Sequence, residues 1–450
     1  MANIAIINFC NLKCEYCFAD DMIHEKSKVI SLEDYRKMLE FMSRTPENHI
    51  GIIGGEPTLH PQFEDILKET NKYCREVNTS ATLFTNGIKL KPFIPLLGDR
   101  IGLLVNCNSP KFVPSNLYSE MISTLDKFYE LSMFDRRVNI GCNIYPSLDD
   151  YSYIWEIVDK YHIHHIRHSV VSPGGKFMHM RNDKESYYLS LKKKYINFCK
   201  EAIKHRCELG LDCGRIPECY FTTEELEIAN EATHGYHVDF CEPVIDITSD
   251  FKAVSCFGAY NAGSIDIRDF NTIMEVRRYL TANMSYPAAK ANCTGRCTTC
   301  KKHELMQCSG GCLGFSPICN PGGIKEYYNN SSEEDKKVIN IPKLVESESD
   351  NSKNEEVNEN NSTNFEMRIM LNIPAEDGKI YKIDLPESEF EKMKKEGTIN
   401  DYISNYIKEE RAKELKEISD KEEEKLEKVE AEIVSKDDDF HYRPGGNKEC

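Results

Sequence analysis

The amino-acid sequence predicts an α/β fold, a partial (β/α)6 TIM-type barrel, followed by a cysteine-rich module and a charged, partly disordered tail. Two observations lead to this prediction. Between residues 1 and 235, short apolar segments alternate with longer amphipathic ones, as in parallel βαβ units. The chain also contains 19 cysteines in 450 residues, and most of them fall in two dense sets that are expected to bind metal.

Six segments of the first part are predicted strands because they are short, apolar and bounded by turn residues. They are residues 3–8, 50–53, 80–84, 101–106, 138–144 and 165–171. The segments between them carry apolar residues at helical spacing, and Ser31 is placed to cap the first of these helices. The predicted helices are residues 31–43, 63–77, 118–131 and 151–161.

The composition changes after the expected barrel, which we assign to residues 1–235. Residues 236–325 are dominated by cysteines, glycines and short apolar pieces, and no long helical period follows residues 272–281. A segment of this kind is expected to fold around metal rather than around a large core. We therefore predict an auxiliary iron–sulfur domain here.

The last part of the chain is acidic and low in apolar residues. Residues 326–365 are rich in Asn, Ser and Glu and are expected to be a disordered linker. Residues 366–450 follow as a separate tail. Within it, 366–373 and 379–385 are predicted to pair as a hairpin, and 387–434 to form a charged helix with a solvated face and a break at Gly397.

The charge and the hydropathy of the chain exclude two classes of partner. The formal net charge is −17 and no basic face is evident, which argues against nucleic-acid binding. No apolar run approaches 18 residues, so we expect no membrane span. The N-terminal residues do not resemble a signal peptide, and a cytoplasmic location is expected. In that compartment, abundant cysteines favour metal ligation over disulfides.

Three cysteines follow the first predicted strand at the spacing C-x3-C-x2-C: Cys10, Cys14 and Cys17. Thiolates are the usual ligands of iron–sulfur clusters, and three of them leave one iron of a four-iron cluster open to an outside ligand. A zinc site is the alternative, although structural zinc usually has four protein ligands. With the aromatic Phe18 directly after it, the triplet resembles the signature of the radical S-adenosylmethionine (SAM) superfamily.

A second motif, Ile52-Ile53-Gly54-Gly55-Glu56-Pro57-Thr58-Leu59-His60-Pro61, follows the second predicted strand and closely resembles the SAM-binding segment of that superfamily. Two glycines at a strand end let the backbone come close to a ligand. The resemblance implies that Gly54, Gly55 and Glu56 bind the methionine part of SAM, and that Phe18 also lies among the cofactor-binding residues.

Polar residues stand at or near the carboxyl ends of the later predicted strands, where ligands of α/β barrels bind. Asn86 follows the third strand, Asn106 ends the fourth, and Asn143 lies in the fifth. We expect these three to contact SAM, and Arg167 on the sixth strand to pair with a carboxylate. Each of them could instead be an ordinary turn or surface residue.

The superfamily resemblance implies a reaction type. A reduced [4Fe-4S] cluster passes an electron to SAM, a carbon–sulfur bond breaks, and a 5′-deoxyadenosyl radical removes a hydrogen from the substrate. An external electron donor of the flavodoxin or ferredoxin type would supply the electron. The protein positions the cofactor and excludes water and oxygen.

The downstream cysteines resemble the SPASM module of radical SAM enzymes that modify peptides. Two features depart from that module: Phe251 stands where it has a glycine, and seven residues separate Cys300 from Cys308 where it has five. By the resemblance, Cys241, Cys256 and Cys312 would hold one auxiliary cluster. The other would be held by the remaining members of the pattern, Cys297, Cys300, Cys308 and Cys319.

The first auxiliary set lacks a fourth ligand. Cys213 and Cys219 are both candidates, and an open iron is the third alternative. Zinc knuckles are the competing interpretation of the whole region, since C-x2-C pairs also bind zinc.

The SPASM-like pattern implies a peptide substrate that acquires a thioether or another crosslink. An anaerobic sulfatase maturase, which makes formylglycine, is an alternative. Such maturases place an Asp just after the second cysteine of the first auxiliary pair, where this chain has Phe257. A small-molecule radical dehydrogenase and a non-enzymatic iron–sulfur scaffold are the remaining hypotheses.

Overall fold

The structure of the chain is a computed structural model. It describes residues 1–330 except 24–27, 135, 173–174, 237–239 and 321–322, and beyond them 368–374, 380–386, 392–393, 396, 398, 401–406 and 408. The chain divides into two compact units, Met1–Asp350 and Asn351–Cys450. None of the helices within these described ranges is both long enough and apolar enough to cross a membrane.

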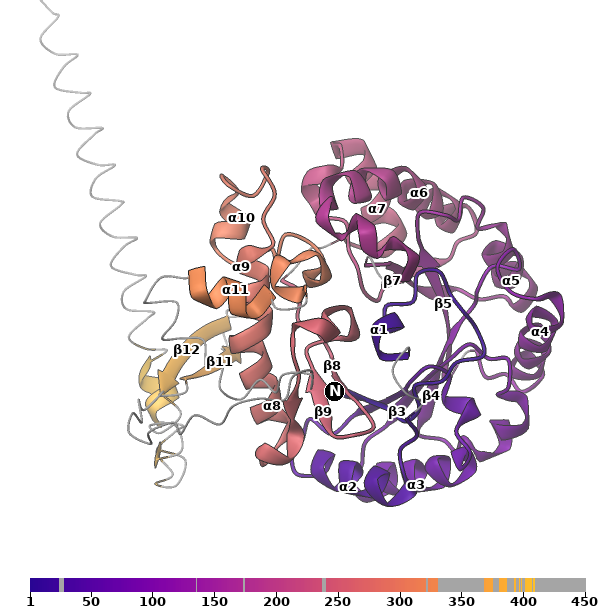
Figure 1. The fold of residues 1–450 in the computed structure, drawn as a ribbon, viewed down its shortest axis with the longest axis horizontal. Helices are drawn as coiled ribbons and strands as arrows, with labels where there is room; N and C mark the ends of the chain where they lie inside the picture. The colour runs from indigo at the N-terminus through magenta and orange to yellow at the C-terminus, as the bar shows by residue number, and fades with distance from the viewer. Residues whose placement is uncertain are drawn as a thin grey trace, which may run out of the picture. The chain divides into compact units, whose positions relative to one another are not determined.

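The first unit is built on one curved, open sheet of ten strands in the order β10-β9-β8-β1-β2-β3-β4-β5-β6-β7 (Figure 1). The run from β1 to β7 is parallel and follows chain order, which confirms the partial α/β barrel. Its strands are β1 Ala2–Ala5, β2 Ile50–Ile53, β3 Ala81–Thr85, β4 Ile101–Asn106, β5 Val138–Ile144, β6 His165–Val170 and β7 Glu208–Leu211.

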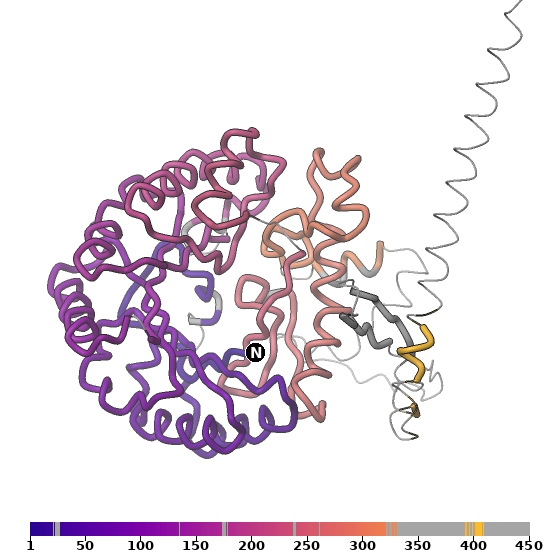
Figure 2. Tube along the Cα trace, turned by 180° about the vertical axis from the view of Figure 1, so that it is seen from behind, coloured from indigo at the N-terminus to yellow at the C-terminus, as the bar shows by residue number. Residues whose placement is uncertain are grey.

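Helices cover the outer, convex face of this sheet (Figure 2). The four predicted helices are present, and Ser31 does cap the first of them, its hydroxyl oxygen accepting a hydrogen bond of 3.0 Å from the Asp34 amide. Two further helices, α6 and α7, complete the rim. The helices of the rim are α2 Leu32–Met42, α3 Phe63–Glu76, α4 Ser115–Glu130, α5 Ser152–Tyr161, α6 Lys184–Lys204 and α7 Thr223–Thr233.

Three short strands extend the sheet on the other side of β1. Strand β8, Ile245–Ile247, pairs in parallel with β1, while β9, Lys252–Val254, and β10, Ile265–Asp266, continue antiparallel. The apolar side chains of this region, such as Ile245 and Val276, belong to the same buried core as the barrel. The region is therefore organised by a shared core as well as by its cysteines, and the division at residue 235 stays a prediction.

The prediction that no long helical period follows residue 281 is wrong. The chain continues from α8, Ile273–Leu280, through a π-helical turn, η7 Thr281–Ser285, into α9, Tyr286–Ala291. The remaining short elements of this unit connect the strands and the cysteine-bearing loops. They are α1 Asp20–Ile23, η1 Pro57–Leu59, η2 Lys91–Leu96, η3 Gly175–Asn182, η4 Glu218–Tyr220, η5 Phe257–Ala262, η6 Ile267–Asp269, α10 Lys301–Glu304, η8 Leu313–Phe315, η9 Pro317–Cys319 and α11 Gly323–Asn330.

The second unit contains the predicted hairpin. Strand β11, Arg368–Pro374, pairs antiparallel with β12, Ile380–Pro386, with Ile369 opposite Leu385. Helix α11 runs past residue 326, where the linker was expected to begin. Of the charged helix expected at 387–434, residues 401–406 are helical, and most of the rest lies outside the described residues, as does most of the linker.

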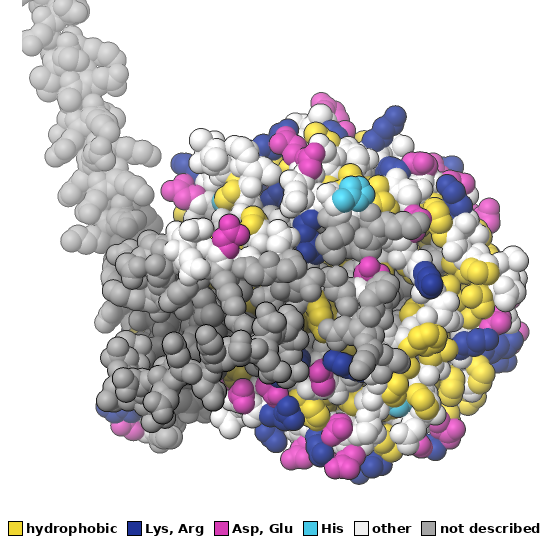
Figure 3. Space-filling model, viewed as in Figure 1, with side chains coloured by type: hydrophobic (Ala, Val, Ile, Leu, Met, Phe, Trp, Pro, Cys, Tyr) yellow, Lys and Arg dark blue, Asp and Glu magenta, His cyan; other side chains and the backbone are white. Residues whose placement is uncertain are grey.

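The surface of the first unit mixes charges of both signs. In Figure 3, basic and acidic side chains are interspersed along the helical rim on the face that is shown. Many of them are paired across one helix turn, as Lys68 is with Glu64 at 2.8 Å. A surface of this kind agrees with the prediction that the chain does not bind nucleic acid, which stays a prediction.

Candidate active site and metal centres

The cysteine triplet lies in the loop that leaves β1. The chain continues the direction of β1 up to Phe9, because the amides of Gly55 and Glu56 donate to the carbonyl oxygens of Ile7 and Phe9 at 2.8 and 2.9 Å. The chain then turns, and the amide of Cys17 donates to the carbonyl oxygen of Cys14 at 3.1 Å. The turn brings the three predicted ligands to one place.

The three thiols of the triplet are close enough to disfavour one another's ionisation. Burial, together with the neighbouring Cys17 and Cys10, raises the pKa of Cys14 to about 12. Burial is also the main reason that the pKa of Cys10 rises to about 11 and that of Cys17 to about 12. A bound cation would reverse this tendency, because thiolates are the form that binds metal.

The chemistry of the donor set suits an iron–sulfur cluster, because all three groups of the triplet are thiols, the usual ligands of such clusters. A structural zinc ion usually has four protein ligands, and the triplet supplies three.

Gly54 and Gly55 are required by the close approach of two backbone segments. A Cβ on Gly54 would lie 2.2 Å from the carbonyl oxygen of Ile7, and one on Gly55 would lie 2.3 Å from that of Phe9. Any side chain would push the turn after β2 away from the triplet loop. The two glycines thus allow the two loops to pack closely. Their contact with SAM stays a prediction.

Glu56 is buried and fully engaged inside the protein. Its Oε1 accepts from the hydroxyls of Thr58 and Thr85, both at 2.7 Å, and from the Thr58 amide at 3.2 Å. Its Oε2 accepts from the Asn86 amide at 2.8 Å. Burial raises the pKa of this carboxyl group, and the hydrogen bonds oppose that rise. The side chain joins the ends of β2 and β3, and its predicted contact with SAM stays a prediction.

Two of the predicted asparagines contact the triplet loop. The side-chain amide of Asn86 donates to Asn11 Oδ1 at 2.8 Å, and that of Asn143 donates to the Tyr16 hydroxyl at 3.2 Å. Asn106 instead faces β5, since its Oδ1 would lie 2.6 Å from a Cβ on Gly141. Asn86 and Asn143 are thus better placed than Asn106 to reach a ligand of the triplet.

The sequence prediction missed Tyr16. Its buried hydroxyl donates to Asn108 Oδ1, which also lies 3.8 Å from Cys14 Sγ. Tyr16, Asn108 and Asn143 therefore form one polar network under the triplet. The readable signal was the position of Tyr16 between two predicted ligands, where an aromatic residue with a polar end can pack and bond at once.

Arg167 and Phe18 have partners within the chain. Arg167 donates to Asp212, which lies just after β7, so its expected carboxylate partner is a residue of the protein. The ring of Phe18 is 53% exposed, and its centroid lies 6.0 Å from that of Phe257. This contact joins the residue after Cys17 to the residue after Cys256.

Four of the downstream cysteines form a first auxiliary group: Cys213, Cys241, Cys256 and Cys312. Burial raises the pKa of each thiol. After burial, the neighbouring Cys312 is the largest cause of the raised pKa of the other three thiols. Cys241 and Cys213 also raise the pKa of Cys256. Cys213 is accessible to solvent even though protein surrounds its thiol on most sides. In the structure, Cys213 thus lies near Cys241, Cys256 and Cys312, the set whose fourth ligand the sequence left open.

A second auxiliary group lies around α10. Cys297 and Cys300 are joined by a backbone hydrogen bond of 3.1 Å, and the Cys308 amide donates to the carbonyl oxygen of Lys302 at 3.1 Å. Cys319, which the pattern assigns to the same cluster, is 2% exposed in η9. The cysteines expected to be ordinary core residues, Cys74, Cys107, Cys142 and Cys199, are all buried.

A buried lysine between the two groups was also missed. Lys184 Nζ donates to the carbonyl oxygens of Asn292 and Gly310, at 2.7 and 2.9 Å, and to Asn292 Oδ1 at 2.8 Å. Burial lowers its pKa, while Cys297, Cys293, Cys308 and Cys312 raise it. No sequence spacing links Lys184 to these residues, which are more than a hundred positions away.

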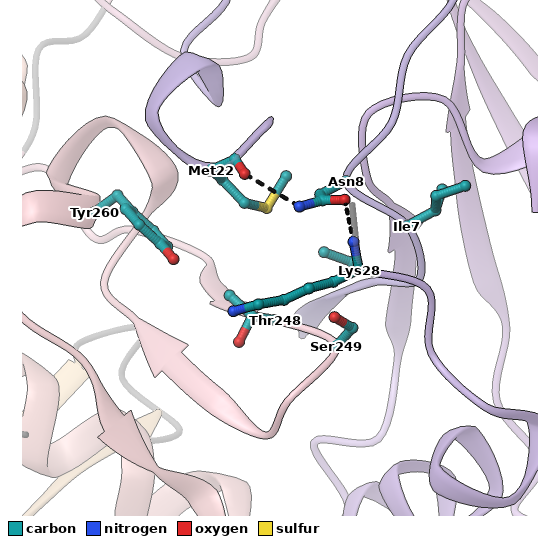
Figure 4. A pocket seen from close by; sticks show the side chains of 8 residues that line it. Ile7, Asn8, Met22, Lys28, Thr248, Ser249 and Tyr260 are labelled. Carbon is teal, nitrogen blue, oxygen red and sulfur yellow. Dashed lines mark hydrogen bonds between the residues drawn. The ribbon is translucent and has the colours of Figure 1, made fainter. Parts of the chain in front are cut away.

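A small pocket lies where the chain leaves β1 (Figure 4). Its lining includes Ile7, Asn8, Met22, Lys28 and residues of the β8–β9 turn. Asn8 spans it, donating to the Met22 carbonyl oxygen at 3.4 Å and accepting from the Lys28 amide at 2.6 Å. These bonds fix the start of the triplet loop against the segment that follows it.

Comparison with known proteins supports the reading of the triplet. Residues 4–140 match the radical SAM superfamily. A 7,8-dihydro-6-hydroxymethylpterin dimethyltransferase of Methanocaldococcus jannaschii is 36% identical over 94 residues, 20% of this chain and 18% of that protein. A GTP 3′,8-cyclase of Vibrio vulnificus is 24% identical over 148 residues, 30% of this chain and 44% of that protein. The chain thus spans less than half of either relative.

Solved structures of similar fold include two proteins whose structures were determined with SAM bound. SuiB of Streptococcus suis bound to SAM has a TM-score of 0.49 at 18% identity, covering 69% of this chain and 72% of SuiB. A structure of anSMEcpe with AdoMet has a TM-score of 0.48 at 18% identity, covering 75% of this chain and 98% of that one. Residues 4–140, the segment that matches the radical SAM superfamily, contain both the cysteine triplet and the Gly-Gly-Glu turn that packs on it.

Proposed function

We propose that this enzyme modifies a ribosomally made peptide, forming a thioether or another crosslink. When bound, the N-terminal cluster and SAM supply the radical that removes a substrate hydrogen. Forming a crosslink by removal of hydrogen is a net oxidation, so the substrate's second electron needs an acceptor close to the site. The auxiliary thiol groups are the candidates to hold such an acceptor, and an external donor of the flavodoxin or ferredoxin type would supply the first electron.

One observation carries the proposal. Phe18 directly follows the triplet, Phe257 directly follows Cys256, and their ring centroids lie 6.0 Å apart. The loop of the proposed SAM-binding cluster therefore touches the loop of the first auxiliary group. A substrate held beside Phe18 would lie near both sets of thiols, as an oxidation that uses both would need.

The test uses the full-length protein, reconstituted with iron and sulfide without oxygen. With SAM and a reductant it should release 5′-deoxyadenosine, and with a Cys-containing peptide substrate it should yield a product lighter by two hydrogens for each crosslink. The variant with Cys10, Cys14 and Cys17 all changed to Ala should do neither. If this variant still cleaves SAM, the triplet is not required for the reaction.

A second candidate is formation of formylglycine, which Asp246 favours. Its Oδ2 accepts from the Phe257 amide at 2.8 Å, so a carboxyl group from β8 lies beside the position where such maturases have an Asp. An aldehyde in the product, trapped by a hydrazide reagent, would select this reaction over a crosslink.

A further inference from the structure

Cys219 lies in η4, Glu218–Tyr220, and the segment 294–302 holds all three residues of this turn. Lys302 Nζ donates to Glu218 at 2.7 Å. The guanidinium of Arg296 donates to the carbonyl oxygen of Cys219 at 3.3 Å and lies 5.0 Å from the ring centroid of Tyr220. Since the same segment carries Cys297 and Cys300, these contacts place Cys219 beside that pair.

The electrostatic neighbours of the Cys219 thiol agree with this placement. Burial raises its pKa, and Cys297, Cys308 and Cys300 raise it further, while Arg296 lowers it. These three cysteines are the ones that the sequence pattern assigns to a single auxiliary cluster. Cys219 and these three cysteines, which come from two distant segments, therefore lie close enough to influence one another.

Cys319 lies on the side of the other group. Arg181 donates to the carbonyl oxygen of Cys319 and, through its second nitrogen, to that of Gly258, both at 3.2 Å. Gly258 stands two residues after Cys256. Burial is the main reason that the pKa of the Cys319 thiol rises to about 12; Cys312 and Cys241 contribute to this rise, and Arg181 opposes it. Both the bonds and the charges connect Cys319 to the first group.

We propose that Cys219, in place of Cys319, is the fourth thiolate ligand of the cluster held by Cys297, Cys300 and Cys308. This assignment rests on the auxiliary clusters of the proposed function. With Cys213 in the first group, the segment 213–219 gives one ligand to each cluster. A Cβ on Gly214 would lie 1.6 Å from the carbonyl oxygen of Val170, so this segment turns tightly against the end of β6 between the two ligands.

Cys293 is the competing ligand, because Cys293, Cys297 and Cys300 repeat the spacing C-x3-C-x2-C. Its thiol lies 2.7 Å from His303 Nε2 and also interacts with the Cys297 thiol. The other ring nitrogen of His303 lies 3.0 Å from the carbonyl oxygen of Cys308. His303 therefore contacts both the Cys293 thiol and the backbone of Cys308, and Cys293 provides a matched control.

The experiment starts from full-length protein with Cys10, Cys14 and Cys17 changed to Ala, so that only auxiliary clusters remain. This parent should bind about eight irons, two clusters' worth. Cys219→Ala should lower that number by about four or convert one cluster to a three-iron form visible by electron paramagnetic resonance. Cys293→Ala and Cys319→Ala should leave iron, sulfide and spectrum unchanged.

A second measurement avoids substitutions at the site. In wild-type protein loaded with iron, Cys219 should resist iodoacetamide, and it should become labelled once iron is removed, as mass spectrometry of the peptides would show. Exposed Cys293 should react in both states. Labelling of Cys219 in the loaded protein, or loss of iron in Cys319→Ala or Cys293→Ala but not in Cys219→Ala, overturns the assignment. A parent that binds no iron would instead refute the auxiliary clusters themselves.

Discussion

The side chains of Glu56 and Thr85 are joined by a buried hydrogen bond of 2.7 Å between the turn after β2 and the end of β3. The same carboxylate binds Thr58 and the Asn86 amide. An acidic residue of the motif that resembles a SAM-binding segment thus works as a structural clamp. Its position explains how the Gly54–Gly55 turn keeps its place against the triplet loop.

Glu56→Gln should lower the free energy of unfolding by about 2 kcal/mol, because the amide cannot accept from every donor that the carboxylate satisfies. Urea unfolding of reconstituted protein measures this, and SAM binding by equilibrium dialysis should weaken in parallel. Glu64→Gln, on the exposed start of α3, is the control and should change neither quantity. Full stability in Glu56→Gln would show that the clamp is unimportant.

Tyr16→Phe should make the N-terminal cluster more labile. The substitution removes only the hydroxyl that Asn108 and Asn143 share, so the loss of stability should be about 1 to 2 kcal/mol. Release of iron to a chelator should be faster than in wild type. Tyr129→Phe, at an exposed position, should release iron at the wild-type rate, and equal rates in all three proteins would count against the network.

Lys184→Met keeps most of the unbranched apolar side chain but removes the donor to three oxygens, Asn292 O, Asn292 Oδ1 and Gly310 O. The free energy of unfolding should fall by about 3 kcal/mol. The reduction potential of the auxiliary clusters should also become more negative, because a nearby positive charge is lost. Lys192→Met on the same helix breaks only a pair with Glu225 near the surface, and should cost less than about 1 kcal/mol with no change in potential.

Because His168 is buried, we expect the free energy of unfolding to fall at low pH. Burial lowers the pKa of its imidazole to about 4, below the usual 6.5, so the unfolded chain takes up this proton at a higher pH than the folded one. The contribution to stability is therefore complete above pH 6.5 and is lost progressively as the pH falls towards 4, by about 3 kcal/mol in total. His168→Phe should remove this pH dependence.

Thermal unfolding at several pH values checks the His168 prediction. The difference between wild type and variant should be constant above pH 7 and should shift in favour of the variant towards pH 4. The ring of His168 stacks on Tyr195 at 5.5 Å, so a phenyl ring suits the site and any packing penalty is independent of pH. Parallel curves over the whole range would contradict the prediction.

Local patterns predicted the strands and helices of the barrel well. The strand at 50–53 and the helix starting at Phe63 appear as predicted, because a short apolar run and a helical spacing of apolar residues can both be recognised within a few residues. Strand β7 was missed because its four residues, one of them glycine, are too short to show a period. Helix α6 does show one, in buried Tyr187, Leu191 and Tyr195, and could have been predicted.

The candidate site was predictable only in part. The triplet could be predicted because its three cysteines lie within one short loop and their spacing can be read directly from the sequence. The partners of Lys184 lie 108 and 126 residues away, and no pattern encodes a contact at that distance. The same limit applies to Cys219 and Cys319, whose positions depend on Arg296 and Arg181. Which thiols meet is decided by tertiary packing, which a linear pattern does not contain.

The parallel pairing of β1 with β8 has a consequence for biosynthesis. Asn3 and Asp246, joined by a hydrogen bond of 2.8 Å, are 243 residues apart. At the usual rates of translation, roughly 10 to 50 s pass between their emergence from the ribosome. Throughout this interval the edge of β1 beside β8 remains uncovered, and the adjoining triplet loop stays open on that side. The first three cysteines therefore emerge well before the auxiliary region that later contacts their loop through Phe257.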